Sequence, residues 1–209
     1  ASPSGGADIN ELKKYSAYFL GKDDKVIYLT FDEGSLETYV KEIVDVLNNN
    51  QVKATFFLCK TFIEENPDLI KHMVRSGHSI GNHTFHHENM PSLATRENFS
   101  KYLFELKETE DAFYKITNQK MDKVYRDPRG EWSFRDLTII KDLGYKTFFY
   151  SANYDDFSRT LTKEEALNEM MRRYHNGAIY LIHPNNKGNY EALGSFISEM
   201  KKLGFTFDL

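Results

Sequence analysis

The segment Val26–Gly34 (VIYLTFDEG) shows the pattern that decides the fold: a short run of β-forming residues that stops abruptly at two acids and a glycine. Such short runs, bounded by turn signals, are typical of strands. From residue 25 onward, similar runs alternate with longer segments in which apolar residues recur at helical spacing. Strands that alternate with helices predict βα units and a parallel sheet.

This alternation places the expected elements along the chain. The expected strands are Val26–Phe31, Lys53–Leu58, Ser79–Asn82, Lys123–Arg126, Lys146–Ser151, Ala178–His183 and Phe205–Phe207. The expected helices are Leu36–Asn49, Glu64–Ser76, Thr95–Ile116, Ser133–Leu143, Lys163–Tyr174 and Tyr190–Leu203. Three of these helices end in a glycine turn that leads into the next strand, at Gly77, Gly144 and Gly204. About seven parallel strands favour a closed or nearly closed α/β barrel over a doubly wound sheet.

Length and composition limit the classes of protein to consider. A chain of 209 residues that is 40% hydrophobic and 28% charged is expected to form one globular domain, at 25–209. Residues 1–24 form an N-terminal extension, whose first residues (ASPSGG) are interpreted as a cloning remnant or a trimmed linker. The net charge of -4 comes from interspersed Lys and Glu, which argues against a nucleic-acid partner. No stretch is apolar enough to cross a bilayer, and a single cysteine, Cys59, excludes intrachain disulfides and a thiolate-rich zinc site.

His83 and His87 form the most informative pair in the chain. They lie four residues apart just after an expected strand, Ser79–Asn82. Imidazoles at this spacing can bind one metal ion, and a carboxylate can supply a third ligand. Three protein ligands leave a coordination position open for water, which is typical of catalytic rather than structural sites. The alternative is a pair of loop histidines that bond to backbone carbonyl groups.

Other polar residues follow the expected strands at the same end. Because ligands bind at the C-terminal ends of parallel strands, these residues are candidates for one active site. Of the adjacent acids Asp32 and Glu33, one is placed to bind metal while the other faces substrate. Arg126 is placed to hold Asp32 in its ionised form, and His183 to act as a general acid. A turn-forming acidic pair and a buried structural histidine are the alternatives.

The turn that follows Arg126 and the aromatic residues near the strand ends suggest substrate contacts. Backbone N–H groups in the turn that contains Arg129 and Gly130 can face a developing oxyanion. Tyr150 can stack on a sugar ring, although aromatic side chains in this chain are core residues first.

Taken in order, five segments resemble the five motifs of the polysaccharide deacetylase family, the NodB-homology group or carbohydrate esterase family 4. They are Thr30–Gly34, His83–His87, Arg126–Gly130, Tyr150–Phe157 and Leu181–His183. The resemblance implies a distorted (β/α) barrel, the NodB-homology fold, and metal-dependent removal of N-acetyl groups from amino sugars. Two histidines and a carboxylate suit Zn²⁺, with Co²⁺ or Mn²⁺ as alternatives.

The resemblance also assigns roles to individual residues. It makes Asp32 the general base, His183 the general acid, Arg126 the residue that orients the base, and Asp156 the partner of the acid. It makes Glu33, His83 and His87 the metal ligands, and it places Arg129, Gly130 and Tyr150 at the substrate. This chain departs from the family pattern because Glu33 replaces an aspartate, Arg129 an aromatic residue, Asp127 a proline, Asn153 an acid and Phe157 a tryptophan.

These departures resemble one group within the family, the N-acetylmuramic acid deacetylases that prepare muramic δ-lactam in spore cortex peptidoglycan. Arg129 suits a substrate that carries the lactyl carboxylate of muramic acid. The resemblance implies peptidoglycan glycan strands as the partner, a monomer, and export to the cell-wall or cortex side of the membrane. The alternatives are a deacetylase of N-acetylglucosamine polymers, either peptidoglycan or chitin oligosaccharides, and a catalytically silent carbohydrate-binding protein.

Overall fold

The computed structural model describes residues 8–34 and 38–209. Its centre is a parallel sheet whose strands follow the order β1 (Ala17–Tyr18), β6 (Lys146–Phe148), β5 (Val124–Tyr125), β4 (Ser79–Asn82), β3 (Thr55–Leu58), β2 (Val26–Glu33) and β7 (Ala178–Ile182), and β8 (Thr206–Asp208) pairs with β2. Every pairing between these strands is parallel. The sheet therefore has the βα architecture that the alternating pattern predicts.

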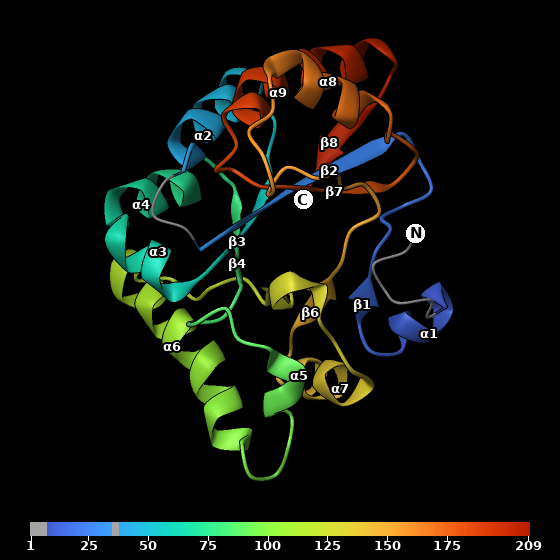
Figure 1. Cartoon of the computed structure of the whole chain (residues 1–209). Helices are drawn as coiled ribbons and strands as arrows, with labels where there is room; N and C mark the ends of the chain where they lie inside the picture. Colours follow the sequence, from blue (N-terminus) through green and yellow to red (C-terminus); the bar gives the residue numbers. More distant parts are fainter. Residues whose placement is uncertain (1–7, 35–37) are drawn as a thin grey trace.

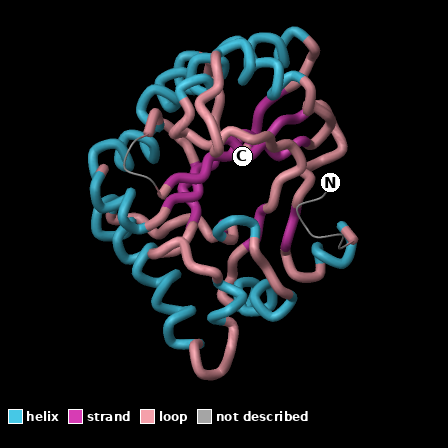
Figure 2. Tube along the Cα trace, in the orientation of Figure 1, coloured by secondary structure: helices cyan, strands magenta, loops and turns pink. Residues whose placement is uncertain are grey.

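The sheet curls until the β6 and β7 sides meet. Beyond the end of β6, Ala152 forms a bridge with Tyr180 of β7, and the Leu181 amide donates to the Ala152 carbonyl at 3.0 Å. At the opposite end of the barrel, the segment after β1 reaches β7 through a bridge between Leu20 and Ala178. Figure 1 and Figure 2 show the strands arranged as a ring with helices around it. The prediction of a distorted barrel is confirmed.

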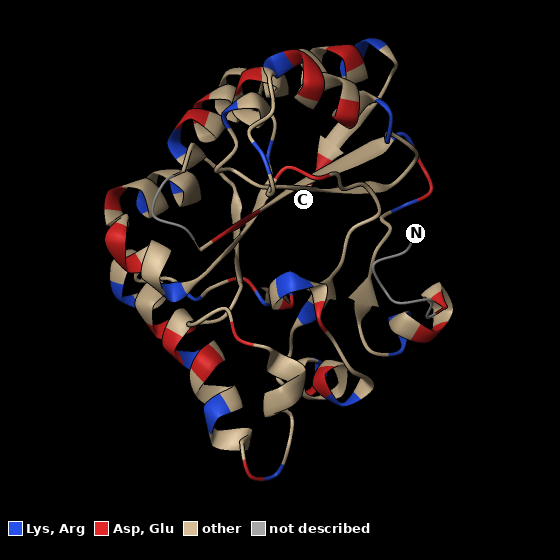
Figure 3. Ribbon diagram, viewed as in Figure 1, with Lys and Arg blue, Asp and Glu red and all other residues tan. Residues whose placement is uncertain are grey.

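Helices surround the barrel. They are α1 (Ile9–Lys13), α2 (Val40–Asn49), α3 (Lys60–Glu65), α4 (Pro67–Arg75), α5 (Met90–Leu93), α6 (Phe99–Thr117), α7 (Phe134–Asp142), α8 (Lys163–Met171) and α9 (Lys187–Lys202). Their charged residues of both signs are interspersed over the outer surface (Figure 3). Within the described residues, no helix combines the length and the apolar character needed to cross a membrane.

The main core lies between the sheet and these helices. Alternate residues of β2 point to opposite faces, so Ile27, Leu29 and Phe31 pack into this core while Tyr28 and Thr30 line the barrel interior. A cavity of about 680 Å³ occupies the interior at the N-terminal ends of the strands. The opposite, C-terminal ends carry the polar residues that the sequence singled out.

Several elements differ from the expected ones. The expected helix Glu64–Ser76 is two helices, α3 and α4, because Pro67 cannot continue a helix and restricts the residue before it. The start of another expected helix, Leu36, lies outside the described residues. The short β1, within the expected extension, joins the sheet, and α1 and α5 were not predicted.

His78, directly before β4, is a buried structural residue. Its Nδ1 accepts a hydrogen bond from the Ala54 amide at 3.1 Å, and its Nε2 lies 2.9 Å from Asn48 Oδ1. Both contacts suit a neutral ring that is protonated on Nε2. Burial, followed by the charges of Lys53 and His72, lowers the pKa of His78 to about 4.

Candidate active site

Arg126, directly after β5, is the best-anchored side chain at the C-terminal rim of the barrel. It is 1% exposed. Its Nη1 donates to Asp32 Oδ1 at 2.9 Å and to Thr30 Oγ1 at 2.7 Å. Its Nε donates to the Phe148 carbonyl at 2.8 Å and its Nη2 to the Phe149 carbonyl at 3.0 Å. These bonds fix the guanidinium and, through it, the carboxylate of Asp32.

Asp32 is held in its ionised form. Burial by itself raises the pKa of this carboxyl, but the Arg126 guanidinium, with His83 and His183, outweighs burial and leaves the pKa below its ordinary value. A partly buried carboxylate without a proton at neutral pH can accept one, as a general base must. The predicted pairing of Arg126 with Asp32 is present in the structure.

His83 follows β4 and faces Asp32. Its Nδ1 lies 2.8 Å from the Arg126 carbonyl oxygen, so Nδ1 carries the proton and Nε2 keeps its lone pair. Nε2 lies 3.8 Å from Asp32 Oδ2. Burial lowers the pKa of His83 against the opposing charge of Asp32. The ring is therefore neutral, in the tautomer that a metal ion requires.

His87 stands beside His83. The two ring centroids are 4.9 Å apart and the planes meet at 71°. Burial, followed by the charges of His83 and Arg129, lowers the pKa of His87 to about 4. Both imidazoles are thus neutral near pH 7, and their donor chemistry fits a divalent metal ion.

The loop that carries these histidines has an unusual backbone. Thr84 has φ 74° and His87 has φ 57°, in the left-handed region that costs non-glycine residues about 1–2 kcal/mol each. Local bonds compensate: the Thr84 amide donates to Asn82 Oδ1 at 2.9 Å, and the His87 amide donates to Thr84 Oγ1 at 3.0 Å. Asn82 is itself held by helix α6 through the Leu106 carbonyl at 2.9 Å.

Glu105 of α6 also holds this loop, and the sequence did not indicate it. Its Oε1 accepts from the His86 amide at 2.8 Å, and its Oε2 lies 2.6 Å from His86 Nδ1. Glu105 is only 4% exposed. Because this carboxylate binds both the backbone amide and the ring of His86, it restricts the position of the next residue, His87.

His183, after β7, is partly exposed and pairs with the buried Asp156. Its Nδ1 lies 2.6 Å from Asp156 Oδ1, and its amide donates to Asp156 Oδ2 at 2.8 Å. Asn189 of α9, which the sequence did not indicate, donates to the same Oδ2 at 2.8 Å. Burial lowers the pKa of His183, but the hydrogen bond and charge of Asp156 outweigh it and raise the pKa above its ordinary value. A raised pKa favours the protonated imidazolium, which is the form that a general acid needs.

The three predicted substrate residues lie around this rim. Arg129 is exposed on a short 3-10 turn, Pro128–Gly130, and has φ 58°. Gly130 has φ 68°, and a Cβ atom there would lie 3.1 Å from the Tyr150 hydroxyl oxygen. The Tyr150 ring centroid is 5.5 Å from the Arg126 guanidinium carbon. Tyr150 therefore packs between the turn and the anchored arginine, beside Asp32.

Glu33 occupies the last position of β2 and is 3% exposed. Across residues 8–34 and 38–209, no group of three or more His, Cys, Asp and Glu side chains has the arrangement of a metal site. The structure thus brings His83 and His87 together and sets Asp32 beside them. The assignment of Glu33 as the third ligand stays a prediction.

Comparisons with known proteins agree with this geometry. The polysaccharide deacetylase family matches residues 20–148. The chain is similar to the peptidoglycan-N-acetylmuramic acid deacetylase PdaA of Bacillus subtilis strain 168, with 40% identity over 98% of this chain and 78% of the relative. The solved structure of PdaA, a family 4 carbohydrate esterase, superposes with a TM-score of 0.90 at 38% identity, and the match covers 97% of this chain and 87% of that one.

Two other relatives have different activities. A peptidoglycan-N-acetylglucosamine deacetylase of Bacillus cereus is 27% identical over 92% of this chain and 90% of its own length. The crystal structure of a family 4 pseudoenzyme from Bacillus anthracis superposes with a TM-score of 0.81 at 28% identity, and the match covers 91% of this chain and 66% of that one.

Proposed function

The chain belongs to the polysaccharide deacetylase family, and we propose that it removes the N-acetyl group from N-acetylmuramic acid residues of peptidoglycan in a metal-dependent reaction. Family membership and the similarity to PdaA identify an amide-hydrolysing deacetylase. The observation that carries the proposal is that one rim of the barrel holds both a proton acceptor and a proton donor, each paired with a residue of opposite charge. Asp32 is paired with Arg126, which favours its ionised form, and His183 is paired with Asp156, which favours its protonated form.

These two groups suit the two proton transfers of amide hydrolysis. Asp32 accepts a proton from the water that adds to the acetyl carbonyl carbon. His183 then donates its proton to the amide nitrogen as the C–N bond breaks, so that acetate and a free amine leave. Arg126 keeps Asp32 in place throughout. The Arg129 amide, on the turn at the same rim, is our candidate donor to the carbonyl oxygen, because the Gly130 amide already donates to the Asp127 carbonyl at 3.1 Å.

A divalent metal completes the proposal. His83 and His87 would hold it together with a carboxylate, for which Glu33 is our candidate, and Zn²⁺ is the expected ion, with Co²⁺ or Mn²⁺ as alternatives. When bound, the ion supplies Lewis-acid polarisation of the substrate carbonyl. The neutral state of both imidazoles and the free Nε2 of His83 support this assignment.

The choice of muramic acid rests on Arg129 and on the similarity to PdaA. Arg129 is an exposed cation next to the proposed site, and its charge acts on His87. A guanidinium there suits the lactyl carboxylate, which N-acetylglucosamine lacks. We further propose that the product enters muramic δ-lactam formation in spore cortex, and that the protein acts as an exported monomer on the cell-wall side of the membrane.

A silent carbohydrate-binding role is the second candidate, because a pseudoenzyme is among the relatives. The two ion pairs argue against it, since binding alone requires neither an oriented base nor a tuned acid. A deacetylase of N-acetylglucosamine polymers is the third candidate, on the similarity to the Bacillus cereus enzyme.

One experiment separates these candidates. Peptide-stripped peptidoglycan strands and a chitin oligosaccharide are each incubated with the metal-loaded protein, and released acetate is measured together with the mass of the products. We expect acetate from the muramic residues and none once Asp32 is replaced by Asn. Metal-loaded protein that releases no acetate from either substrate would support the silent role. Acetate from chitin, or product masses that place the loss of acetyl groups on the glucosamine residues of the peptidoglycan strands, would support the third candidate.

A further inference from the structure

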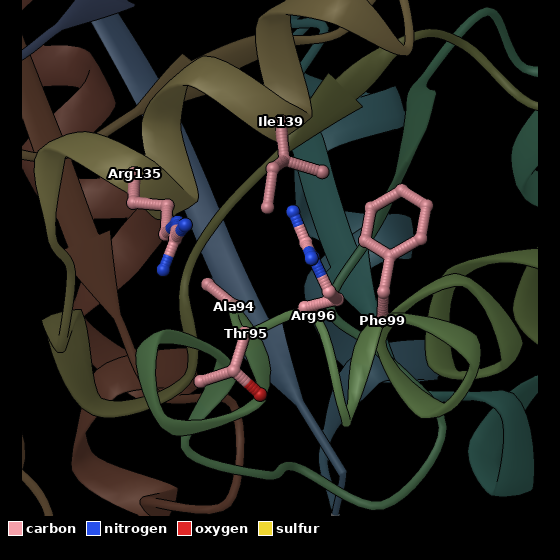
Figure 4. Close-up of a pocket in the computed structure, with 6 residues that line it drawn as sticks. All are labelled: Ala94, Thr95, Arg96, Phe99, Arg135 and Ile139. Atoms are coloured by element: carbon pink, nitrogen blue, oxygen red, sulfur yellow. The ribbon is translucent and has the colours of Figure 1, made fainter.

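A surface groove lies between the segment after α5 and helix α7. It has a volume of about 280 Å³ and is lined by Ala94, Thr95, Arg96, Phe99, Arg135 and Ile139. Figure 4 shows the guanidinium groups of Arg96 and Arg135 directed toward the space between Ala94 and Ile139. We call this the Arg96–Arg135 groove. None of the residues assigned to catalysis or to the metal lines it.

Both arginines are available for a ligand. The arginines that form ion pairs in the described part of the chain are Arg126, Arg159, Arg172 and Arg173. Arg96 and Arg135 are therefore exposed cations that have no acidic partner among the described residues. In a protein with a net charge of -4, two unpaired guanidinium groups that line one groove make a local positive site.

The groove also offers an apolar wall. Phe99 is 41% exposed although it is a large aromatic side chain, and Ile139 lies across from it. An exposed aromatic face beside guanidinium groups suits a sugar ring that carries a carboxylate, because the ring packs on the apolar face and the acid binds the cations. Phe99 also begins α6, whose N-terminal dipole favours negative charge.

The groove is within reach of a substrate strand bound at the active site. Arg135 follows Arg129 by six residues, so their Cα atoms lie no more than about 22 Å apart. A glycan strand held at the active site continues beyond it in both directions. Each muramic residue of the strand presents a carboxylate, either on its lactyl group or on an attached peptide.

We propose that the Arg96–Arg135 groove is a second binding site for the peptidoglycan strand, in which the two arginines bind a carboxylate several sugars away from the residue being deacetylated. This inference rests on the proposed function, since it assumes a strand at the active site. The groove then favours long strands over short ones, because a second contact adds to the binding of the same molecule.

The test compares substrates of two lengths. The double variant Arg96→Gln/Arg135→Gln is assayed on long peptide-stripped strands and on a short oligosaccharide with one muramic residue. We expect KM for the long strands to rise roughly tenfold, the effect of two exposed charged contacts, while kcat and both constants for the short substrate stay within about twofold. Arg75→Gln, an exposed arginine of α4 that also forms no ion pair among the described residues, is the matched control.

Two results would overturn the inference: a change of less than about twofold on long strands, or an equal rise in KM for both substrates. A binding assay keeps it separate from the proposed function. Sedimentation with cell walls stripped of phosphate polymers should retain the wild type at low salt and release the double variant. If the wild type sediments with these cell walls and the double variant does not, but the wild type releases no acetate, the proposed function fails while binding of the strand by the groove remains supported. If binding requires the phosphate polymers, the carboxylate site is wrong.

Discussion

Replacing Asp156 by Asn tests the proposed acid most directly. The Asp156 carboxylate makes three contacts, with the ring of His183 through Oδ1 and with the His183 amide and Asn189 through Oδ2. The side-chain amide of Asn has one acceptor oxygen and one NH₂ group in place of the two carboxylate oxygens. If its oxygen serves the two N–H donors, its NH₂ group faces His183 Nδ1, which then must accept a hydrogen bond and cannot carry the proton.

The expected effect follows from the causes of the raised pKa. Without the charge and hydrogen bond of Asp156, burial is left to lower the pKa of His183. A reaction that needs protonated His183 is lost as the pH rises through this pKa, so the alkaline limb of the pH–rate profile should move to lower pH. At neutral pH we expect kcat to fall by about 10²–10⁴-fold, the range of a lost general acid, with KM changed by less than about threefold.

The assay is acetate release as a function of pH, with urea unfolding at each pH to show that the variant is folded. Asp155→Asn is the control, because Asp155 is exposed and its side chain accepts hydrogen bonds from the neighbouring residues Phe157 and Ser158, not from His183. A folded Asp156→Asn enzyme with kcat within threefold of the wild type and an unmoved alkaline limb would refute the role of this pair.

Three further predictions concern other parts of the structure. Glu105→Gln should weaken metal binding by roughly 10–100-fold by loosening the loop before His87, whereas Glu108→Gln on the same helix should not, as measured by metal titration. Arg129→Ala should lower kcat/KM on muramic strands about tenfold and leave any activity on chitin oligosaccharides unchanged, as compared by acetate release. The lowered pKa of His78, about 4 in the fold, means that the stability contributed by this residue is fully present above pH 6.5 and falls as the pH drops from 6.5 to 4. Because His87 titrates in the same range, urea titrations should show a loss of stability that is about 3 kcal/mol smaller in His78→Gln than in the wild type.

Local patterns predicted the central elements well. β2 and β7 were expected because long apolar runs stop at polar residues, and both are central strands of the barrel. β1 was missed because a strand of two residues has no periodicity and forms only when β6 offers it a partner. Pro67 marks the break between α3 and α4, but the break was not predicted because apolar residues recur at helical spacing on both sides of it.

The site was predictable to the extent that its residues follow strands. His83, Arg126 and His183 directly follow strands and Asp32 lies at the end of β2, and parallel strands bring their ends to one rim. Glu105 and Asn189 could not be predicted in this way, because they reach the rim from the middle of α6 and the start of α9. Their roles depend on how helices pack against loops, and local sequence patterns do not predict this packing.

The anchoring of Arg126 links the chemistry to the closure of the barrel. Its Nε and Nη2 bond to carbonyl groups of Phe148 and Phe149, and the next few residues form the join between the β6 and β7 sides. Opening of this join, even with the rest of the barrel intact, would release the arginine and leave Asp32 without its partner. Heat inactivation should therefore precede global melting, and hydrogen exchange at the Leu181 amide should report the loss of activity better than exchange in the helices.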